Sequence, residues 1–152
     1  MANGRSADEI AIPALIRAAR GTYSKAIQAR LVAAGFEDMP RSGPYVLGGM
    51  ANHGLAPEDL IRDLSVSKQA ASQLIDSLVV RGYLDRRINP EDRRRMTLEL
   101  TDRGRAAAAA VQAGVKAVDG ELVQMLSPEG VAGLRAGLVA LIDIKERMEH
   151  ES

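Results

Sequence analysis

Two groups of side chains in the middle of the chain could bind a polyanion. The first follows the short connection Leu64-Ser65-Val66 and consists of polar residues at helical spacing: Ser67, Lys68, Gln69, Ser72 and Gln73. Because Gln69 and Gln73 are four residues apart, a helix would place both amides on one face. A glutamine amide can make two hydrogen bonds to adenine, and a lysine ammonium can bind guanine or a phosphate, so this set could read base edges. The alternative is an ordinary solvated helix face, and the sequence does not say which base each residue would contact.

The second group is a cluster of arginines. Five of them lie between residues 86 and 95, against two acids, which leaves a local charge of +3: Arg86, Arg87, Arg93, Arg94 and Arg95 against Glu91 and Asp92. The whole chain is neutral, with 20 basic and 20 acidic residues, so its net charge gives no argument for a nucleic-acid partner. The local concentration does, because arginines on a loop can reach phosphates or a narrow minor groove.

Residue types that support catalysis or metal binding are scarce. The chain has no cysteine, and its two histidines are His53 and His150. Adjacent acids such as Glu37-Asp38 and Glu58-Asp59 are typical of turns and helix starts rather than of a catalytic pair. We therefore expect no enzyme, no cofactor and no metal site. The missing cysteine also excludes thiol oxidation as a switch.

Both groups depend on elements that hydrophobic periodicity and cap residues predict. Helices are expected over about residues 8–34, 43–52, 56–63, 67–81, 101–125 and 127–149, and a β-hairpin over 83–88 and 96–100. The fold class is therefore mainly α with one β-hairpin and about six helices. Helices 56–63 and 67–81 form a helix-turn-helix candidate, and the arginines sit around the hairpin loop. The pair Gly48-Gly49 costs the second helix about 2 kcal/mol relative to alanine, which leaves its length open.

The order of these motifs resembles the MarR-type winged helix-turn-helix transcription regulators. The matching stretches are LIRDLSVS (60–67), LIDSL (74–78), RGYL (81–84), NPEDRR (89–94) and LELTDRG (98–104). The last two look like the D-x-R wing of this family and the L-T-x-x-G start of its next helix. The likeness is clear over residues 56–105 and covers the rest mainly through helix order. Gly48-Gly49 departs from a typical helix of the family.

The resemblance implies a single domain, residues 1–152, that forms an obligate homodimer. A winged lobe over 41–101 would bind DNA, and helices over 8–35 and 102–150 would form the dimerisation region. The sequence permits this, because the apolar seams over 12–31 and 131–148 exceed what a small central lobe could cover. Core packing within one monomer is the alternative use of these seams.

The resemblance also implies roles for the wing residues. Arg94 would reach the minor groove, Asp92 would brace the wing by pairing with a nearby arginine, and Arg93 and Arg95 would point at phosphates or solvent. The partner would be a pseudo-palindromic operator in double-stranded DNA, with half-sites about 10 base pairs apart. Repression is the usual activity of the family.

Small molecules, often lipophilic anions or phenols, release many members of this family from DNA. Candidates for such a pocket in this sequence are Tyr23, Tyr45, Met50 and His53, with core packing or a helix end as the alternative role. We expect a cytoplasmic protein, associated with the nucleoid when it is bound to DNA. Residues 1–9 do not read as a secretory signal, and no wholly apolar run approaches the roughly 18 residues of a membrane span. The competing function is a winged-helix dimer that binds proteins or sequesters a ligand without reading DNA.

Overall fold

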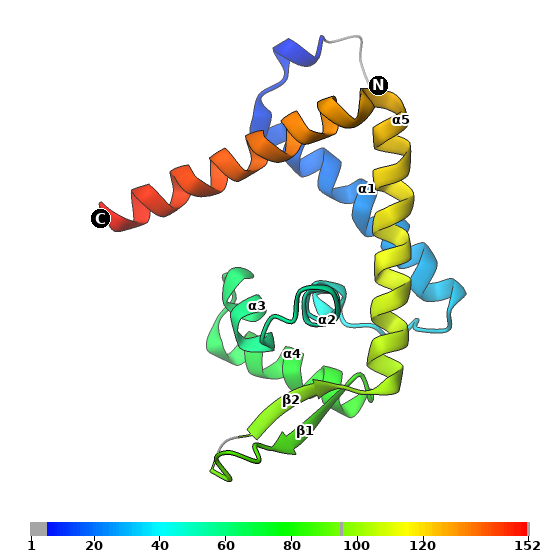
Figure 1. Cartoon of the computed structure of the whole chain (residues 1–152), viewed down its shortest axis with the longest axis vertical. Coiled ribbons are helices and arrows are strands. Elements are labelled where there is room, and N and C mark those ends of the chain that lie inside the picture. Colours follow the sequence, from blue (N-terminus) through cyan, green and yellow to red (C-terminus); the bar gives the residue numbers. More distant parts are fainter. Residues whose placement is uncertain (1–5, 95, 152) are drawn as a thin grey trace. The chain divides into compact units, whose positions relative to one another are not determined.

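The computed structural model describes residues 6–94 and 96–151, with the backbone alone described for Ala7 and Met96. The chain forms two compact units, one up to Val115 and one from Lys116. Its elements in chain order are a 3-10 turn (Ala7–Glu9), α1 (Ile12–Ala33), α2 (Gly43–His53), α3 (Pro57–Asp63), α4 (Lys68–Val80), β1 (Leu84–Ile88), β2 (Met96–Leu100) and α5 (Asp102–His150) (Figure 1). The expected fold class, mainly α with one β-hairpin, is confirmed.

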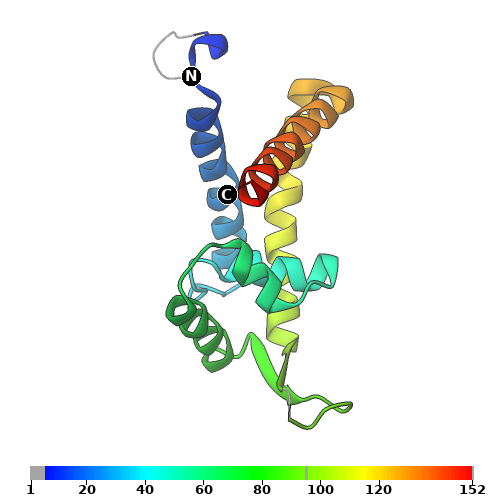
Figure 2. The same cartoon turned by 90° about the vertical axis from the view of Figure 1, so that its left-hand side faces the viewer.

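The first unit contains a helix-turn-helix followed by the hairpin. The strands pair antiparallel, from Leu84 opposite Leu100 to Ile88 opposite Met96. β1 contacts α4 and β2 contacts α2, while the far end of the hairpin projects from the lobe of α2, α3 and α4 (Figure 2). This arrangement is a winged helix, in which the hairpin is the wing.

One hydrophobic core holds these elements together. It is formed by buried side chains from α1 and the loop after it, from α2, α3, α4 and the turn before β1, and from the starts of β1 and α5: Leu31, Phe36, Val46, Leu47, Ile61, Leu78, Tyr83, Leu84, Ala107, Ala108 and Val111. Gly114 allows α1 and α5 to approach closely, because a Cβ there would lie 2.7 Å from Cα of Ile27. The beginning of α5 is therefore packed on α1 through backbone as well as side chains.

The glycine pair in α2 has two different roles. A Cβ on Gly49 would lie 2.4 Å from Cδ2 of Leu60 in α3, whereas one on Gly48 would meet Cγ1 of Val111 at an ordinary 3.5 Å. Gly49 thus allows α2 and α3 to pack closely. This tertiary packing offsets the propensity cost, and α2 extends over 11 residues.

The second unit consists of the remainder of α5. The backbone is non-helical at Ser127, with φ 64° and ψ 163°, so two helices meet there, as the Ser127-Pro128 start signal predicts. After this break most large apolar side chains are exposed: Leu134, Leu138, Val139, Leu141, Ile142, Ile144 and Met148. Among the described residues, α5 also contains an 18-residue window of mean hydropathy 1.3, long and apolar enough to cross a membrane by length and composition alone. Core helices of soluble proteins meet that criterion too, so it is weak evidence of a span.

Replacing Gly49 by alanine is expected to destabilise the fold. The new Cβ would overlap the buried side chain of Leu60, and overpacking of this kind costs about 1–3 kcal/mol. The free energy of unfolding in urea measures the effect. Gly48→Ala is the matched control, because it has room for the methyl group and should gain up to about 1 kcal/mol from helix propensity. Equal stability of the two variants would contradict the packing described for α2 and α3.

Candidate nucleic-acid interface

A capped helix start places the polar residues of α4 at the surface. Ser67 precedes the helix in an extended conformation, and its hydroxyl oxygen accepts a hydrogen bond from the N–H of Ala70 at 3.1 Å. This bond satisfies a backbone donor that the first turn leaves unpaired. All five side chains of the first predicted group are exposed: Ser67, Lys68, Gln69, Ser72 and Gln73. Leu78 is fully buried on the opposite face, so α4 has the predicted amphipathic orientation.

The tip of the wing is shaped by hydrogen bonds from the backbone to side chains. Oδ1 of Asn89 accepts from the N–H of Glu91 at 2.9 Å, and Oδ1 of Asp92 accepts from the N–H of Arg94 at 3.0 Å. Asn and Asp side chains stabilise tight turns in this way. Asp92 therefore braces the wing through the backbone of Arg94, while its pairing with an arginine side chain stays a prediction.

Two of the five clustered arginines lie on β1 and are paired with acids. Arg86 forms an ion pair of 2.5 Å with Asp76 on α4. Arg87 pairs with Asp85 at 3.0 Å and with Glu99 on β2 at 3.9 Å. The pair of Arg86 and Asp76 ties the wing to the helix that carries the polar face. The pair of Arg87 and Glu99 ties the two strands to each other.

The remaining positive charge is at the wing tip. Arg93 and Arg94 are exposed there, and Arg95 lies outside the described residues. The arginine cluster therefore has two parts. Arg86 and Arg87 on the strand are paired with acids, and Arg93 and Arg94 lie exposed at the tip. Exposed guanidinium groups on a projecting loop are suited to phosphates or to a narrow minor groove.

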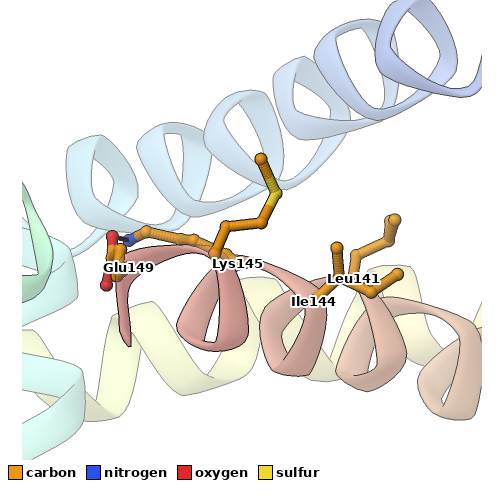
Figure 3. Close-up of a pocket in the computed structure, with 5 residues that line it drawn as sticks. Leu141, Ile144, Lys145 and Glu149 are labelled. Atoms are coloured by element: carbon orange, nitrogen blue, oxygen red, sulfur yellow. Dashed lines mark ion pairs between the residues drawn. The ribbon is translucent and has the colours of Figure 1, made fainter. Parts of the chain in front are cut away.

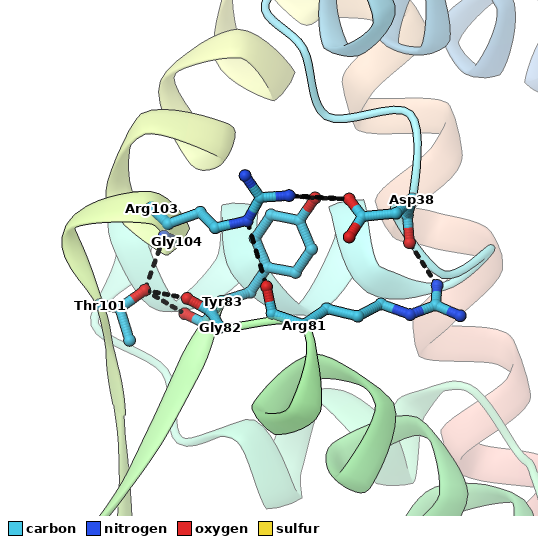
Figure 4. Close-up of polar contacts among 7 residues, drawn as sticks. All are labelled: Asp38, Arg81, Gly82, Tyr83, Thr101, Arg103 and Gly104. Atoms are coloured by element: carbon cyan, nitrogen blue, oxygen red, sulfur yellow. Dashed lines mark hydrogen bonds and ion pairs between the residues drawn. The ribbon is translucent and has the colours of Figure 1, made fainter.

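A second polar cluster, which we call the Arg103 cluster, lies where the wing meets the helices (Figure 4). Arg103 donates through its terminal nitrogen to Oδ1 of Asp38 at 2.9 Å and to the hydroxyl of Tyr83 at 3.1 Å, and through Nε to the carbonyl of Arg81 at 3.1 Å. The hydroxyl of Tyr83 also donates to Asp38, as does a guanidinium N–H of Arg81 to the Asp38 carbonyl. The Arg103 guanidinium carbon lies over the rings of Tyr83 and Phe36, 4.6 and 5.2 Å from their centroids, as in cation–π contacts.

Backbone packing beside this cluster joins the two ends of the wing. The N–H of Thr101 donates to the carbonyl of Tyr83 at 3.2 Å, and the Thr101 hydroxyl donates to the carbonyls of Gly82 and Tyr83. The same hydroxyl accepts from the N–H of Gly104 at 2.9 Å, which is the predicted threonine cap of α5. A Cβ on Gly104 would lie 2.0 Å from the Tyr83 carbonyl oxygen, so this position requires glycine.

The cluster shifts the protonation equilibria of its members. Burial and the hydrogen bond to Asp38 raise the pKa of Tyr83 to about 12, although the Arg103 charge acts in the opposite direction. The hydrogen bond from Tyr83, together with the Arg103 charge, lowers the pKa of Asp38 below its usual 3.8 despite partial burial. In the sequence, Asp38 is indistinguishable from an ordinary turn acid. The three residues come from positions 38, 83 and 103, and no local spacing connects them.

The four candidates for a small-molecule pocket lie in different surroundings. Tyr23 is half-buried on α1, and His53 is exposed at the end of α2. Tyr45 is 46% exposed and its hydroxyl donates to Oδ2 of Asp63 at 3.4 Å. Met50 borders a cavity, but the other three are not among the described residues that line it.

That cavity has a volume of about 530 Å³ and lies between the end of α2, the start of α3, β2 and the first turn of α5. Its lining includes Met50, Leu55, Pro57, Leu98, Leu100 and Arg105. The size is within the range of sites for small ligands. Over residues 6–94 and 96–151, no group of three or more His, Asp or Glu side chains is placed to hold a metal ion.

Comparison with known proteins agrees with this geometry. A sequence model of the MarR family matches residues 37–95, which include α2, α3, α4 and β1. The HTH-type transcriptional repressor YetL of Bacillus subtilis is 36% identical over 55 residues, a match that covers 36% of this chain and 33% of YetL. The matched segment is thus about a third of the length of that repressor.

Solved structures match nearly the whole chain. A crystal structure of MarR aligns with a TM-score of 0.73 and 19% identity over 98% of this chain and all of the other. Streptococcus pneumoniae FabT in complex with DNA aligns with a TM-score of 0.72 and 20% identity over 90% and 96% of the two chains. The fold and the polar face of α4 define a winged-helix protein. Over residues 37–95 the chain is similar to the MarR family, and over nearly its whole length it has the fold of the solved MarR structure.

Titration of the phenols tests the Arg103 cluster. The chain has three tyrosines and no tryptophan, so absorbance at 295 nm reports tyrosine ionisation directly. The difference between the titration curves of wild type and Tyr83→Phe should show one phenol with a pKa of about 12. Because the folded pKa lies above the ordinary value, the associated stability is present below pH 10 and is lost as the pH rises toward 12. A difference curve centred near pH 10 would contradict the described contacts of Tyr83.

Proposed function

We propose that this chain is a sequence-specific DNA-binding transcription regulator that acts as a homodimer, and that it is a repressor. The observation that carries the proposal is the exposed polar start of α4 beside a wing with exposed arginines at its tip. A major groove about 12 Å wide admits one helix, while the loop of the wing can follow the adjacent backbone or minor groove. The complex of FabT with DNA, a protein of similar fold, supports this reading.

Each predicted residue has a part in this model of binding. Gln69 and Gln73 read base edges, Lys68 contacts a guanine or a phosphate, and Ser67 and Ser72 donate to the backbone or to bases. At the wing, Arg94 enters the minor groove, and Arg93 and Arg95 contact phosphates. The ion pair between Arg86 and Asp76 fixes the wing relative to α4, so that both can bind one stretch of duplex.

The exposed apolar surface supports a homodimer. Helix α1 exposes Ile12, Leu15, Ile16 and Val32, and the end of α5 exposes the large side chains given above. Along that end, Leu141, Ile144 and Met148 share one helix face with the ion pair of Lys145 and Glu149 at 3.6 Å (Figure 3). An apolar face edged by charge is typical of a protein interface, and a second copy would remove both helices from water. Burial of α5 against the second copy would also explain the high mean hydropathy of this helix without a membrane.

A two-fold dimer would present two copies of α4 to DNA. The operator would then be a pseudo-palindrome with half-sites about 10 base pairs apart, on one face of the duplex. Repression follows from the resemblance, and YetL carries the name of a repressor. We further propose that a small lipophilic anion or phenol releases the protein from DNA, and that the protein works in the cytoplasm.

Fluorescence anisotropy tests DNA binding. The probes are the intergenic duplex beside the gene for this chain and a random duplex of equal length, each at two salt concentrations. A sequence-specific regulator should bind the intergenic duplex at least about a thousand-fold more tightly, with strong salt dependence. Absence of binding at low salt would favour the competing function, a module that binds proteins or a ligand.

Replacing Arg94 by alanine should weaken this binding and reduce its salt dependence. If the guanidinium neutralises one phosphate charge, the slope of log K against log salt should fall by about one unit. Arg87→Ala is the control, because Arg87 is paired with Asp85 and Glu99 on the strands and should leave the slope unchanged. An isotherm for Arg94→Ala identical to that of wild type would reject the assignment.

Replacing Leu138 by glutamate should disrupt the homodimer. A charge buried in an apolar interface is costly, so the mass in analytical ultracentrifugation should fall from about twice 16.2 kDa toward 16.2 kDa. Val80→Glu places the same charge on an apolar side chain that is 85% exposed on α4 and should remain dimeric. A dimeric Leu138→Glu variant, or a monomeric wild type, would argue against this interface.

A further inference from the structure

The Arg103 cluster connects three junctions that lie far apart in the sequence (Figure 4). Asp38 belongs to the loop after α1, Tyr83 to the turn that leads from α4 into the wing, and Arg103 to the first turn of α5, directly after the wing. Both ends of the hairpin are therefore fixed at one place, and that place is also bound to the loop that follows α1. A rigid link of this kind can determine the direction in which the wing leaves the lobe.

Three of the five N–H groups of Arg103 donate hydrogen bonds within the protein. Nε and a terminal nitrogen donate three hydrogen bonds, to Arg81, Asp38 and Tyr83, and the guanidinium lies over two aromatic rings. Arg103 is also exposed, with 41% of its side chain accessible, but these bonds hold it at the base of the wing, whereas Arg93 and Arg94 lie at the projecting tip. Its charge is paired with the Asp38 carboxylate at the base of the wing.

The cluster defines geometry more than it adds stability. The side chains of Asp38 and Arg103 are 46% and 41% exposed, and ion pairs that are open to solvent contribute little to the free energy of unfolding. The cluster nevertheless holds a planar guanidinium in a fixed position through three acceptors. Loss of these contacts should leave the core of the lobe intact and loosen the base of the wing.

We propose that Arg103 is a positioning residue for DNA binding, which fixes the wing through Asp38 and Tyr83 and so sets the affinity for the operator without touching DNA. The proposal rests on the proposed function, because it assigns a determinant of the same interface. A substitution of Arg103 is expected to change a different property of binding than a substitution of a residue that contacts DNA. The preference for the operator falls, while the number of phosphate charges neutralised stays the same.

A spin label on the wing tests the first half of the proposal without DNA. The chain has no cysteine, so Glu91→Cys provides a single attachment site for a nitroxide at the exposed wing tip. The label should become more mobile when Arg103→Met or Asp38→Asn is added. Arg30→Met is the charge-matched control for Arg103→Met, since Arg30 is exposed in the last turn of α1, and it should leave the spectrum unchanged. Identical spectra for all variants would overturn the proposal.

DNA binding by the unlabelled full chain tests the second half. Arg103→Met and Asp38→Asn should each weaken binding to the intergenic duplex about three- to thirty-fold. Binding to the random duplex should change less than about two-fold, with an unchanged salt slope. The double variant should lose no more than the weaker-binding single variant, because both substitutions break one unit. Arg103→Lys keeps the charge and should recover part of the affinity.

Four results would overturn either this proposal or the proposed function. A smaller salt slope for Arg103→Met would mean that Arg103 contacts a phosphate, and unchanged affinity for the intergenic duplex would mean that the cluster does not control binding. Either result overturns the proposal, as does an equal loss of affinity for both duplexes, which indicates misfolding and is checked by thermal melting. A wild type with no preference for the intergenic duplex would instead overturn the proposed function, and the label spectra would still decide whether Arg103 holds the wing.

Discussion

The close approach of Gly104 to the carbonyl oxygen of Tyr83 is the constraint on which the wing depends. There is space for a hydrogen at this position but not for a Cβ, which would lie 2.0 Å from that oxygen. Because the approach is so close, Thr101 can bond to the backbone before β1 and cap α5 in the same turn. The start and the end of the hairpin are then held together, and the strands between them need few other contacts to keep their register.

The elements were predictable because their signals are local. Ser67 and Thr101 cap helices through bonds to residues three positions later, and these patterns are readable in any sequence. The exposed polar face of α4 follows from helical period alone. The break at Ser127 was likewise indicated by the proline that follows it. These features cover most of the fold and the placement of the first group of site residues.

Features that depend on residues far apart could not be read in the same way. Asp38 resembles a turn acid in the sequence, and its partners become visible only when the chain brings positions 38, 83 and 103 together. The same holds for Gly49, whose propensity cost predicts a weak helix although its missing side chain accommodates Leu60. For the arginines, the sequence gives the total charge of the cluster. It does not show that two of them, Arg86 and Arg87, are paired with Asp76, Asp85 and Glu99, which come from α4 and both strands.

Charge pairing and close packing therefore act together at the interface. Arg86 pairs with Asp76 and holds the hairpin against α4, and Arg87 pairs with acids within the hairpin, so both strand arginines are balanced by acids while the tip carries Arg93 and Arg94. A basic strand would attract any duplex through its phosphates, which raises affinity without raising specificity. In the proposed mode of binding, the pairing of the strand arginines leaves discrimination to the polar face of α4, which acts together with a wing held at a fixed angle beside it. Under the proposed function, the geometry of the wing base is a condition for specificity as well as for the fold of the wing.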